Sequence, residues 1–346
     1  MQFIAASGFT VLLKIIAVKN KNSINGSAQS IFIISSAIAA CCFLIVFSCS
    51  NPVKKYSEEN TPTSGNLRVC YDEGLALHIK NQVATFESQY PNAYIQIYES
   101  SENQAVQALH NDSCEAILIS RLLTDNEKKA FESKSFFPKH TAVAKSGVAL
   151  ITNALTDLDH LSYEEVIKTI SHPYTFRDSA GNEVSLKVLF DKNNSAVLHY
   201  MMDSVLRSKK LSPNCNILNS TLESINYVAK TKNTLAFIDF AWLSDADDSI
   251  YRANIGKIKF IGVSKPKSDS YELPSQSTFK LGTYPFTRTV YVIRKTGDFT
   301  LAKGFESFVA GPKGQLTFLK QGLLPARQSE RSVKINLGKK TDKNQP

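Results

Sequence analysis

An alternation of short β-prone runs with amphipathic helical segments over residues 67–132 restricts the possible folds more than any other feature of the chain. The β-prone runs are Leu67–Tyr71, Tyr94–Tyr98 and Ala116–Ile119. Between the first two, Ile79, Val83 and Phe86 recur at the spacing that places them on one face of a helix. Strands that alternate with helices in this way predict a parallel sheet in an α/β domain.

Polar residues at two expected helix starts have the spacing of a capping box. Ser101 stands three residues before Gln104, and Thr124 stands three residues before Glu127. In such a pair, each side chain accepts a hydrogen bond from the other residue's main-chain N–H, which satisfies two free donors of the first helical turn. We therefore expect helices to begin at Ser101 and Thr124, after the second and third strands.

Two longer β-prone runs, Thr141–Thr152 and Tyr284–Arg294, lie far apart in the sequence. A chain of 346 residues exceeds one ordinary domain, which favours two lobes. Runs of this length are suited to crossing from one lobe to the other. The predicted division has a first lobe of residues 67–145 plus 290–335 and a second lobe of residues 146–289.

The stretch Lys187–Leu206 predicts a strand, a polar turn and a helix in succession. Asn193 or Asn194 can cap the helix, because an asparagine side chain accepts hydrogen bonds from first-turn N–H groups. A free helix N-terminus behind a short polar loop attracts anions. The alternative is an ordinary capped turn between a strand and a helix, which needs the same residues and no ligand.

The apolar run Ile31–Phe47 ends at Ser48-Cys49 and is followed by a polar segment. A small residue before a cysteine in this position resembles the bacterial lipoprotein signal, in which the cysteine is lipidated after cleavage. We predict a signal peptide at 1–48, lipidation of Cys49 and a flexible tether at 49–66. A retained transmembrane anchor is the alternative, since the run nearly spans a bilayer. Either anchor places the body outside the cytoplasmic membrane, on the periplasmic face of the cell envelope.

The net charge of +9 lies mostly at the two ends of the chain. Residues 1–48 contain three lysines and no acid. Ala326–Pro346 contains six basic residues against two acids and ends in a basic tail at 336–346. Because the body between them has mixed charges and no DNA- or RNA-binding motif, we expect no nucleic-acid partner.

Sequence patterns for catalysis, cofactors and metals are missing. The chain contains no GxSxG, HExxH or GxxxxGK pattern, and its six histidines are scattered. Its six cysteines lack the spacing of a zinc site or a redox pair. We therefore predict a binding protein rather than an enzyme, with no catalytic residue, no cofactor and no metal site.

Several stretches in this order resemble the phosphate-type solute-binding proteins of bacterial ABC importers, and more closely their PstS-like lipoprotein branch in Bacteroidetes. The stretches are AILISRLLTDNEK, KSGVALITN, VLFDKNNSAVLHYMMDSVL, YPFTRTVYVI and FVAGPKGQLTFLKQGLLPAR. The resemblance implies a type 2 periplasmic-binding-protein fold with two lobes, each a mixed sheet flanked by helices, joined by two crossing strands. It also implies an oxyanion in the cleft between the lobes, held by main-chain N–H groups, hydroxyls and helix N-termini.

The phosphate-site positions of that family carry over only in part. The ligand-binding positions implied here are Gly74, Leu75, Ser101, Arg121, Asn193, Asn194 and Ser195. Arg121 stands where the resemblance implies an aspartate, and Asp191 stands where it implies an arginine. Ala196 and Val197 replace a glycine and a threonine. Arg121 can hold an oxyanion in bidentate fashion, but the loss of the proton-accepting aspartate leaves the identity of the anion open.

The same residues have alternative roles that need no ligand. Ser101 can serve as a helix cap alone. Arg121 can pair with a surface acid such as Asp125. The structure has to decide between these roles.

The resemblance implies a lipoprotein that binds phosphate or a related oxyanion and delivers it to an ABC permease with its ATPase. We expect the protein to act as a monomer that its lipid anchors to a membrane. Two alternatives stay open: a binder of a different anionic small molecule, and a sensor or adhesion lipoprotein of the same fold.

Overall fold

The computed structural model describes residues 59–207, 210–295 and 297–327. The predicted signal peptide, Cys49 and the basic tail at 336–346 lie outside these residues. The predicted tether ends earlier than expected, because the first strand, β1 (Gly65–Asp72), already begins at Gly65. In the part of the chain that the structure describes, no helix is both long enough and apolar enough to cross a membrane.

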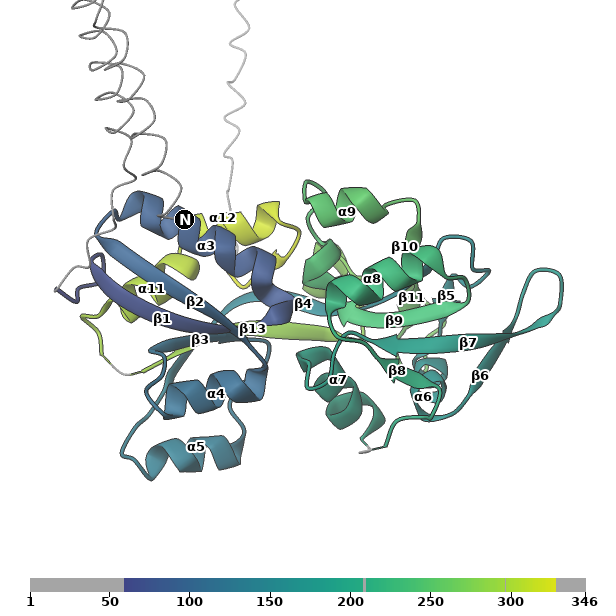
Figure 1. The fold of residues 1–346 in the computed structure, drawn as a ribbon, viewed down its shortest axis with the longest axis horizontal. Helices are drawn as coiled ribbons and strands as arrows, with labels where there is room; N and C mark the ends of the chain where they lie inside the picture. Colours follow the sequence, from purple (N-terminus) through teal and green to yellow (C-terminus); the bar gives the residue numbers. More distant parts are fainter. Residues whose placement is uncertain (1–58, 208–209, 296, 328–346) are drawn as a thin grey trace, which may run out of the picture. The chain divides into compact units, whose positions relative to one another are not determined.

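Most strands of the described residues belong to one large sheet (Figure 1). Its main order is β2 (Ala93–Ser100), β1, β3 (Ala116–Ile119), β13 (Thr287–Arg294), β4 (Lys139–Asn153), β9 (Thr234–Asp239), β7 (Glu183–Phe190) and β6 (Tyr174–Arg177). Three further strands join it at the side: β10 (Ile258–Phe260) and β14 (Leu324–Pro325) on β4, and β8 (Cys215–Ile217) on β7. A separate small sheet contains β12 (Tyr271–Glu272), β11 (Gly262–Ser264) and β5 (His160–Leu161).

The strand directions divide the large sheet into two halves. β1, β2 and β3 are parallel to one another, which confirms the parallel pairing predicted for residues 67–132. β7, β8 and β9 are also parallel to one another. β4 runs antiparallel to both of its neighbours: its residues 139–147 pair with β13, and its residues 148–152 pair with β9. We call the half built on β1–β3 the first lobe and the half built on β7–β9 the second lobe.

Helices cover both faces of the first lobe (Figure 1). One face carries α3 (Ala76–Gln89), α11 (Leu301–Val309) and α12 (Pro312–Lys320), and the other carries α4 (Glu102–His110) and α5 (Asp125–Glu132). Successive side chains of a strand point to opposite faces. Val69 and Tyr71 of β1 accordingly pack in the core with α3, whereas Cys70 packs in a second core with α4.

The second lobe is built in the same way around β7 and β9. Its helices are α6 (Tyr163–Ser171), α7 (Ala196–Tyr200) with a π-helical continuation (Met201–Leu206), α8 (Thr221–Lys230), α9 (Ser249–Asn254) and α10 (Gln276–Leu281). Two short 3₁₀ helices follow strand ends, η2 (Glu73–Leu75) after β1 and η4 (Phe240–Leu243) after β9. Both lie beside the junction of the lobes, where they contact each other.

Local sequence signals set most element boundaries. Both predicted capping boxes, at Ser101 and at Thr124, are present. The second crossing strand is shorter than predicted, because β13 begins at Thr287 and not at Tyr284. Tyr284 instead turns inward, and its phenol donates a hydrogen bond of 2.7 Å to the carbonyl oxygen of Val148.

Two glycines with left-handed backbone provide a test of the packing between the lobes. A Cβ added at Gly322 (φ +82°) would lie 2.0 Å from the carbonyl oxygen of Ser244, whereas one added at Gly282 (φ +65°) would meet nothing within 4 Å. We expect Gly282→Ala to lower the free energy of unfolding by about 1 kcal/mol, which is the cost of the backbone conformation. Gly322→Ala should cost about 3 kcal/mol, because overpacking adds to it. Urea unfolding of both variants would measure the difference, and equal losses would contradict this close approach.

Candidate ligand-binding site

The predicted binding residues lie in loops that follow the carboxyl ends of parallel strands. In the first lobe β1 ends at Asp72 and β3 at Ile119, and in the second lobe β7 ends at Phe190 and β9 at Asp239. In open α/β sheets, ligands bind in the crevice beyond such strand ends. The fold therefore brings the predicted positions of both lobes to one region.

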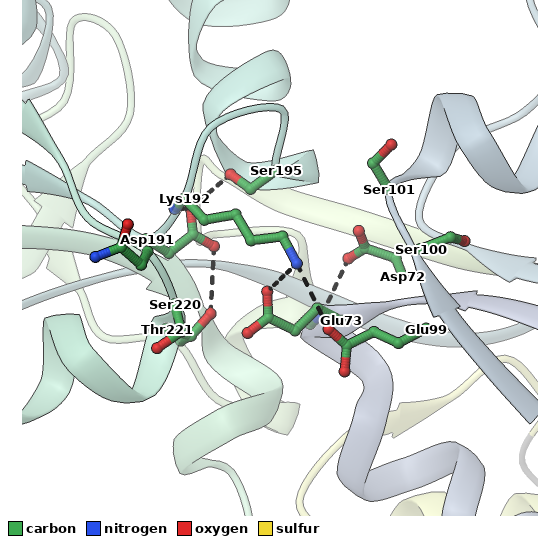
Figure 2. Close-up of polar contacts among 12 residues, drawn as sticks. Asp72, Glu73, Glu99, Ser100, Ser101, Asp191, Lys192, Ser195, Ser220 and Thr221 are labelled. Atoms are coloured by element: carbon green, nitrogen blue, oxygen red, sulfur yellow. Dashed lines mark hydrogen bonds and ion pairs between the residues drawn. The ribbon is translucent and has the colours of Figure 1, made fainter.

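A lysine that the sequence reasoning missed connects the lobes across this region. Lys192 follows β7, and its Nζ lies 2.7 Å from Oε2 of Glu73 and 3.5 Å from Oε1 of Glu99, both in the first lobe. Figure 2 shows the lysine side chain extended towards both carboxylates. Burial by itself would lower the pKa of Lys192, but the hydrogen bond to Glu73 holds that pKa above its ordinary value. A charged contact thus joins the two binding loops.

The predicted first-lobe residues make their hydrogen bonds within their own loops. Gly74 and Leu75 are buried in η2, and the Gly74 N–H donates to Oδ2 of Asp72 at 3.1 Å. Ser101 caps α4, where its hydroxyl accepts the Gln104 N–H and also lies 3.2 Å from Oε1 of Gln104. A Cβ at Gly74 would lie 3.0 Å from Asp239, so glycine permits this close approach of the lobes.

In the second lobe the helix cap is Ser195, and the prediction that Asn193 or Asn194 caps this helix is wrong. The Ser195 hydroxyl accepts the Leu198 N–H at 3.0 Å, and its backbone is extended, as an N-cap requires. Asn194 instead has a left-handed backbone (φ 61°), and both asparagine side chains are exposed. Asn194 therefore makes the turn that leads into the cap.

Asp191 lies behind this cap, where the resemblance implied an arginine. Its Oδ1 accepts hydrogen bonds from the Ser195 hydroxyl at 2.5 Å and from the Lys192 N–H at 2.9 Å, and the Thr221 hydroxyl lies 3.4 Å from its Oδ2 (Figure 2). Burial raises the pKa of Asp191 to about 6, although the Ser195 hydrogen bond acts in the opposite direction. The Asp191 side chain thus stabilises the loop between β7 and α7 through hydrogen bonds within that loop.

Arg121 is held by acids of its own lobe. Its two Nη atoms donate to the two carboxylate oxygens of Glu127 at 2.8 Å each, and its Nε lies 3.4 Å from Glu102. Nη2 also donates to the Asn103 side chain at 2.9 Å. The surface acid that pairs with Arg121 is therefore Glu127, whereas Asp125 pairs with Lys128.

A second arginine, Arg288 of β13, lies at the junction of the lobes and was missed by the sequence reasoning. Its side chain is 3% exposed and forms an ion pair with Asp239. Burial would lower the pKa of Arg288, but the charges of Asp239, Glu102 and Asp72 raise it, so the group stays charged. Among the described residues its Nε has no hydrogen-bond partner. The signal available in the sequence was a charged residue inside the apolar run that forms β13.

A cavity of about 410 Å³ lies beside Arg288 and is shared by the two lobes. From the first lobe it is lined by Glu102, Asn103, Ser120 and Arg121, and from the second by Ala196, His199, Tyr200 and Asp203. Glu102 and Ala196 are the first residues of α4 and α7, so the helices that Ser101 and Ser195 cap both reach it. Of the predicted binding residues, Arg121 lines the cavity itself, and Ser101 and Ser195 each precede a lining residue.

Metal binding has no visible basis in this region or elsewhere in the described residues, where no group of three or more His, Cys, Asp and Glu side chains could hold an ion. Most acids at the cleft are instead engaged by cations, hydroxyls and main-chain N–H groups, as Glu73, Glu127 and Asp191 are. Asp72 differs from these acids. Burial and then the charge of Glu102 raise its pKa well above the ordinary range, which disfavours its charged form. What the arrangement offers a ligand is buried Arg288 and a polar cavity between two lobes.

A family model described as the PBP superfamily domain matches residues 57–313, and the chain therefore belongs to this superfamily of periplasmic binding proteins. Among curated relatives, it is similar to the phosphate-binding protein PstS of Pseudomonas aeruginosa. The two are 22% identical over 307 residues, which covers 82% of this chain and 91% of that protein.

Solved structures show the same fold. A protein from Clostridium perfringens, described as a phosphate ABC transporter substrate-binding protein with bound phosphate, has a TM-score of 0.62 at 17% identity and covers 76% of this chain and 100% of its own. An ABC-type phosphate transport receptor from Vibrio cholerae has a TM-score of 0.58 at 15% identity, with 75% and 100% covered. These similarities confirm the predicted α/β fold of the type 2 periplasmic binding proteins.

The bridge made by Lys192 predicts a change in the opening of the lobes. Lys192→Met keeps the aliphatic stem but removes the charge that joins Glu73 and Glu99 to the second lobe. A partly exposed ion pair stabilises by at most about 1 kcal/mol, so the open fraction should rise about fivefold. Small-angle X-ray scattering of the ligand-free protein would detect a larger radius of gyration. Lys128→Met, which removes an exposed pair within α5, is the control; identical curves for wild type and Lys192→Met would exclude the bridge.

The raised pKa of Asp191 predicts a pH dependence of stability. Between its ordinary pKa of 3.8 and its folded pKa of about 6, the folded protein keeps a proton that the unfolded chain releases. The free energy of unfolding contributed by this group therefore falls as the pH rises through that window, by about 3 kcal/mol in total. Asp191→Asn should remove this slope in urea unfolding between pH 4 and 6, and exposed Asp269→Asn should not. A variant slope equal to that of wild type would contradict the assignment.

Proposed function

We propose that the protein is an extracytoplasmic solute-binding lipoprotein of an ABC importer, which binds phosphate or a related oxyanion between its lobes and delivers it to a permease. Its membership of the PBP superfamily and its similarity to phosphate-binding relatives support this role. Those relatives are receptors, which favours binding over catalysis. Capture would shift an equilibrium between open and closed lobes, because only the closed form supplies groups from both.

The observation that carries the proposal is the buried guanidinium of Arg288 at the shared cavity. A buried charge is costly unless it is paired and hydrogen-bonded, and here Asp239 engages one side of the fork while Nε has no partner among the described residues. An oxyanion in the cavity would satisfy that donor. Arginine suits this role, because its fixed donors match the spacing of oxyanion oxygens.

The predicted ligand set takes a revised form in this proposal. Ser101 and Ser195 cap the helices whose first residues line the cavity, whereas Gly74 and Leu75 lie in η2 and do not line it. Arg121 contributes positive charge from the first lobe, while Asn193 and Asn194 form the outer turn. The anchor is lipidated Cys49, the partners are a permease and its ATPase, and the binding protein acts as a monomer on the periplasmic side of the membrane.

Isothermal titration calorimetry tests this function on the full-length protein in detergent, with phosphate, arsenate, sulfate and pyrophosphate as ligands. We expect saturable binding of at least one of them. Arg288→Lys should weaken it about 10- to 100-fold, because lysine loses the fork that hydrogen-bonds a charged oxygen.

Arg294→Lys is the matched control. Arg294 is also a buried arginine of β13, paired with Glu306, but it does not line the cavity. The Arg294→Lys variant should bind the oxyanion with the same affinity as the wild-type protein. The proposal fails if no oxyanion binds, or if the two variants lose the same affinity.

A further inference from the structure

We infer that the cavity is built for an amino-bearing phosphate monoester rather than for inorganic phosphate. The phosphate group would sit on a buried floor beside Arg288 and Ser120, and the ammonium group would reach an exposed rim at Asp203. This inference rests on the proposed function, because it takes the cavity between the lobes as the ligand site.

The floor of the cavity holds two buried donors that lack partners among the described residues. They are Nε of Arg288 and the hydroxyl of Ser120, on residues that are 5% and 6% exposed. Ser120 follows β3 of the first lobe, and Arg288 belongs to β13. A buried donor without a partner costs about 1–3 kcal/mol, and one phosphate group could accept from both.

The length of the cavity exceeds that of a single tetrahedral ion. Its second-lobe lining includes Ala196, His199, Tyr200, Asp203 and Ser204. These positions share one helical face over nine residues, which corresponds to at most roughly 12 Å along the axis, because the α-helical rise applies up to Tyr200 and the π-helical part that follows rises less. A volume of about 410 Å³ also falls within the range of pockets that enclose whole small molecules. The organic group of a phosphate monoester would fill the part of the cavity that a bare phosphate ion leaves empty.

The charges along the cavity favour a ligand that carries a positive group as well. Three carboxylates line it, from Glu102, Glu127 and Asp203, against the guanidinium groups of Arg121 and Arg288. Glu127 and Glu102 are already engaged by Arg121. Asp203 is exposed on the second lobe and forms no ion pair within the described residues, although its charge acts on Arg121 across the cavity. An ammonium group at the rim would pair with Asp203, whereas bare phosphate would meet it as a like charge.

Calorimetry on the full-length protein in detergent tests the inference with inorganic phosphate, glycerol 3-phosphate and O-phosphoethanolamine. We expect O-phosphoethanolamine to bind at least tenfold more tightly than inorganic phosphate, with glycerol 3-phosphate between them. Asp203→Asn should weaken O-phosphoethanolamine about fivefold, as expected for a rim ion pair, and should not weaken the other two. Asp269→Asn, an exposed acid outside the cavity, is its control.

Ser120→Ala should weaken all three ligands about tenfold, because it removes a donor to the charged group. Ser264→Ala is the matched control: the Ser264 hydroxyl is also buried and lacks a partner among the described residues, but it belongs to β11 and does not line the cavity. Its affinities should equal those of wild type, and equal losses in the two serine variants would overturn the placement of the phosphate group.

The other outcomes separate this inference from the proposed function. If inorganic phosphate binds as tightly as O-phosphoethanolamine, or if Asp203→Asn affects all three ligands alike, the inference is wrong and the proposed function stands. If glycerol 3-phosphate equals O-phosphoethanolamine, the ammonium group has no role and the inference is wrong as well. If none of these three ligands binds, the inference is wrong, and the proposed function fails as well only if arsenate, sulfate and pyrophosphate do not bind either.

Discussion

The buried ion pair between Arg288 and Asp239 is the interaction on which the junction of the lobes depends. Asp239 ends β9 and also accepts hydrogen bonds from Ser146 of β4 at 2.8 Å and from the Ala241 N–H at 2.9 Å. The pair therefore ties β13, β4 and β9 at the place where the sheet passes from one lobe to the other. Removing either partner of a buried pair leaves a bare charge, at a cost of about 3–5 kcal/mol. The same pair orients the guanidinium beside the cavity, so fold and binding share it.

Carboxylates dominate the surroundings of this pair, and the fold accommodates them in two ways. Cations and donors from other loops neutralise some of them, as Lys192 does for Glu73 across the lobes. Burial raises the pKa of others, as it does for Asp72 and Asp191, which makes the charged form less favourable. The cleft is thus less negative than its composition suggests, which reconciles an acidic loop set with capture of an anion.

Predictions from the sequence succeeded where short-range interactions decide the structure. The capping boxes at Ser101 and Thr124 and the strand β1 depend on residues a few positions apart, and they were predicted correctly. The cap of α7 was assigned to the wrong residue, because three adjacent polar residues can all cap and only the left-handed backbone of Asn194 excludes it. Tyr284 was expected in a strand, since nothing local reveals its hydrogen bond to Val148.

The sequence by itself determined the alternation of strands and helices over residues 67–132, the helix starts at Ser101 and Thr124 and the kinship with periplasmic binding proteins, because these follow from local periodicity and from motifs in series. Only the tertiary structure decided which charges meet. Lys192 and Glu73, or Arg288 and Asp239, are far apart in the chain, and their pairing depends on strand register and on how closely the lobes approach at Gly74. No local pattern encodes that geometry. The tertiary structure was therefore needed to show that Nε of Arg288 and the hydroxyl of Ser120 have no partner among the described residues and can serve a ligand.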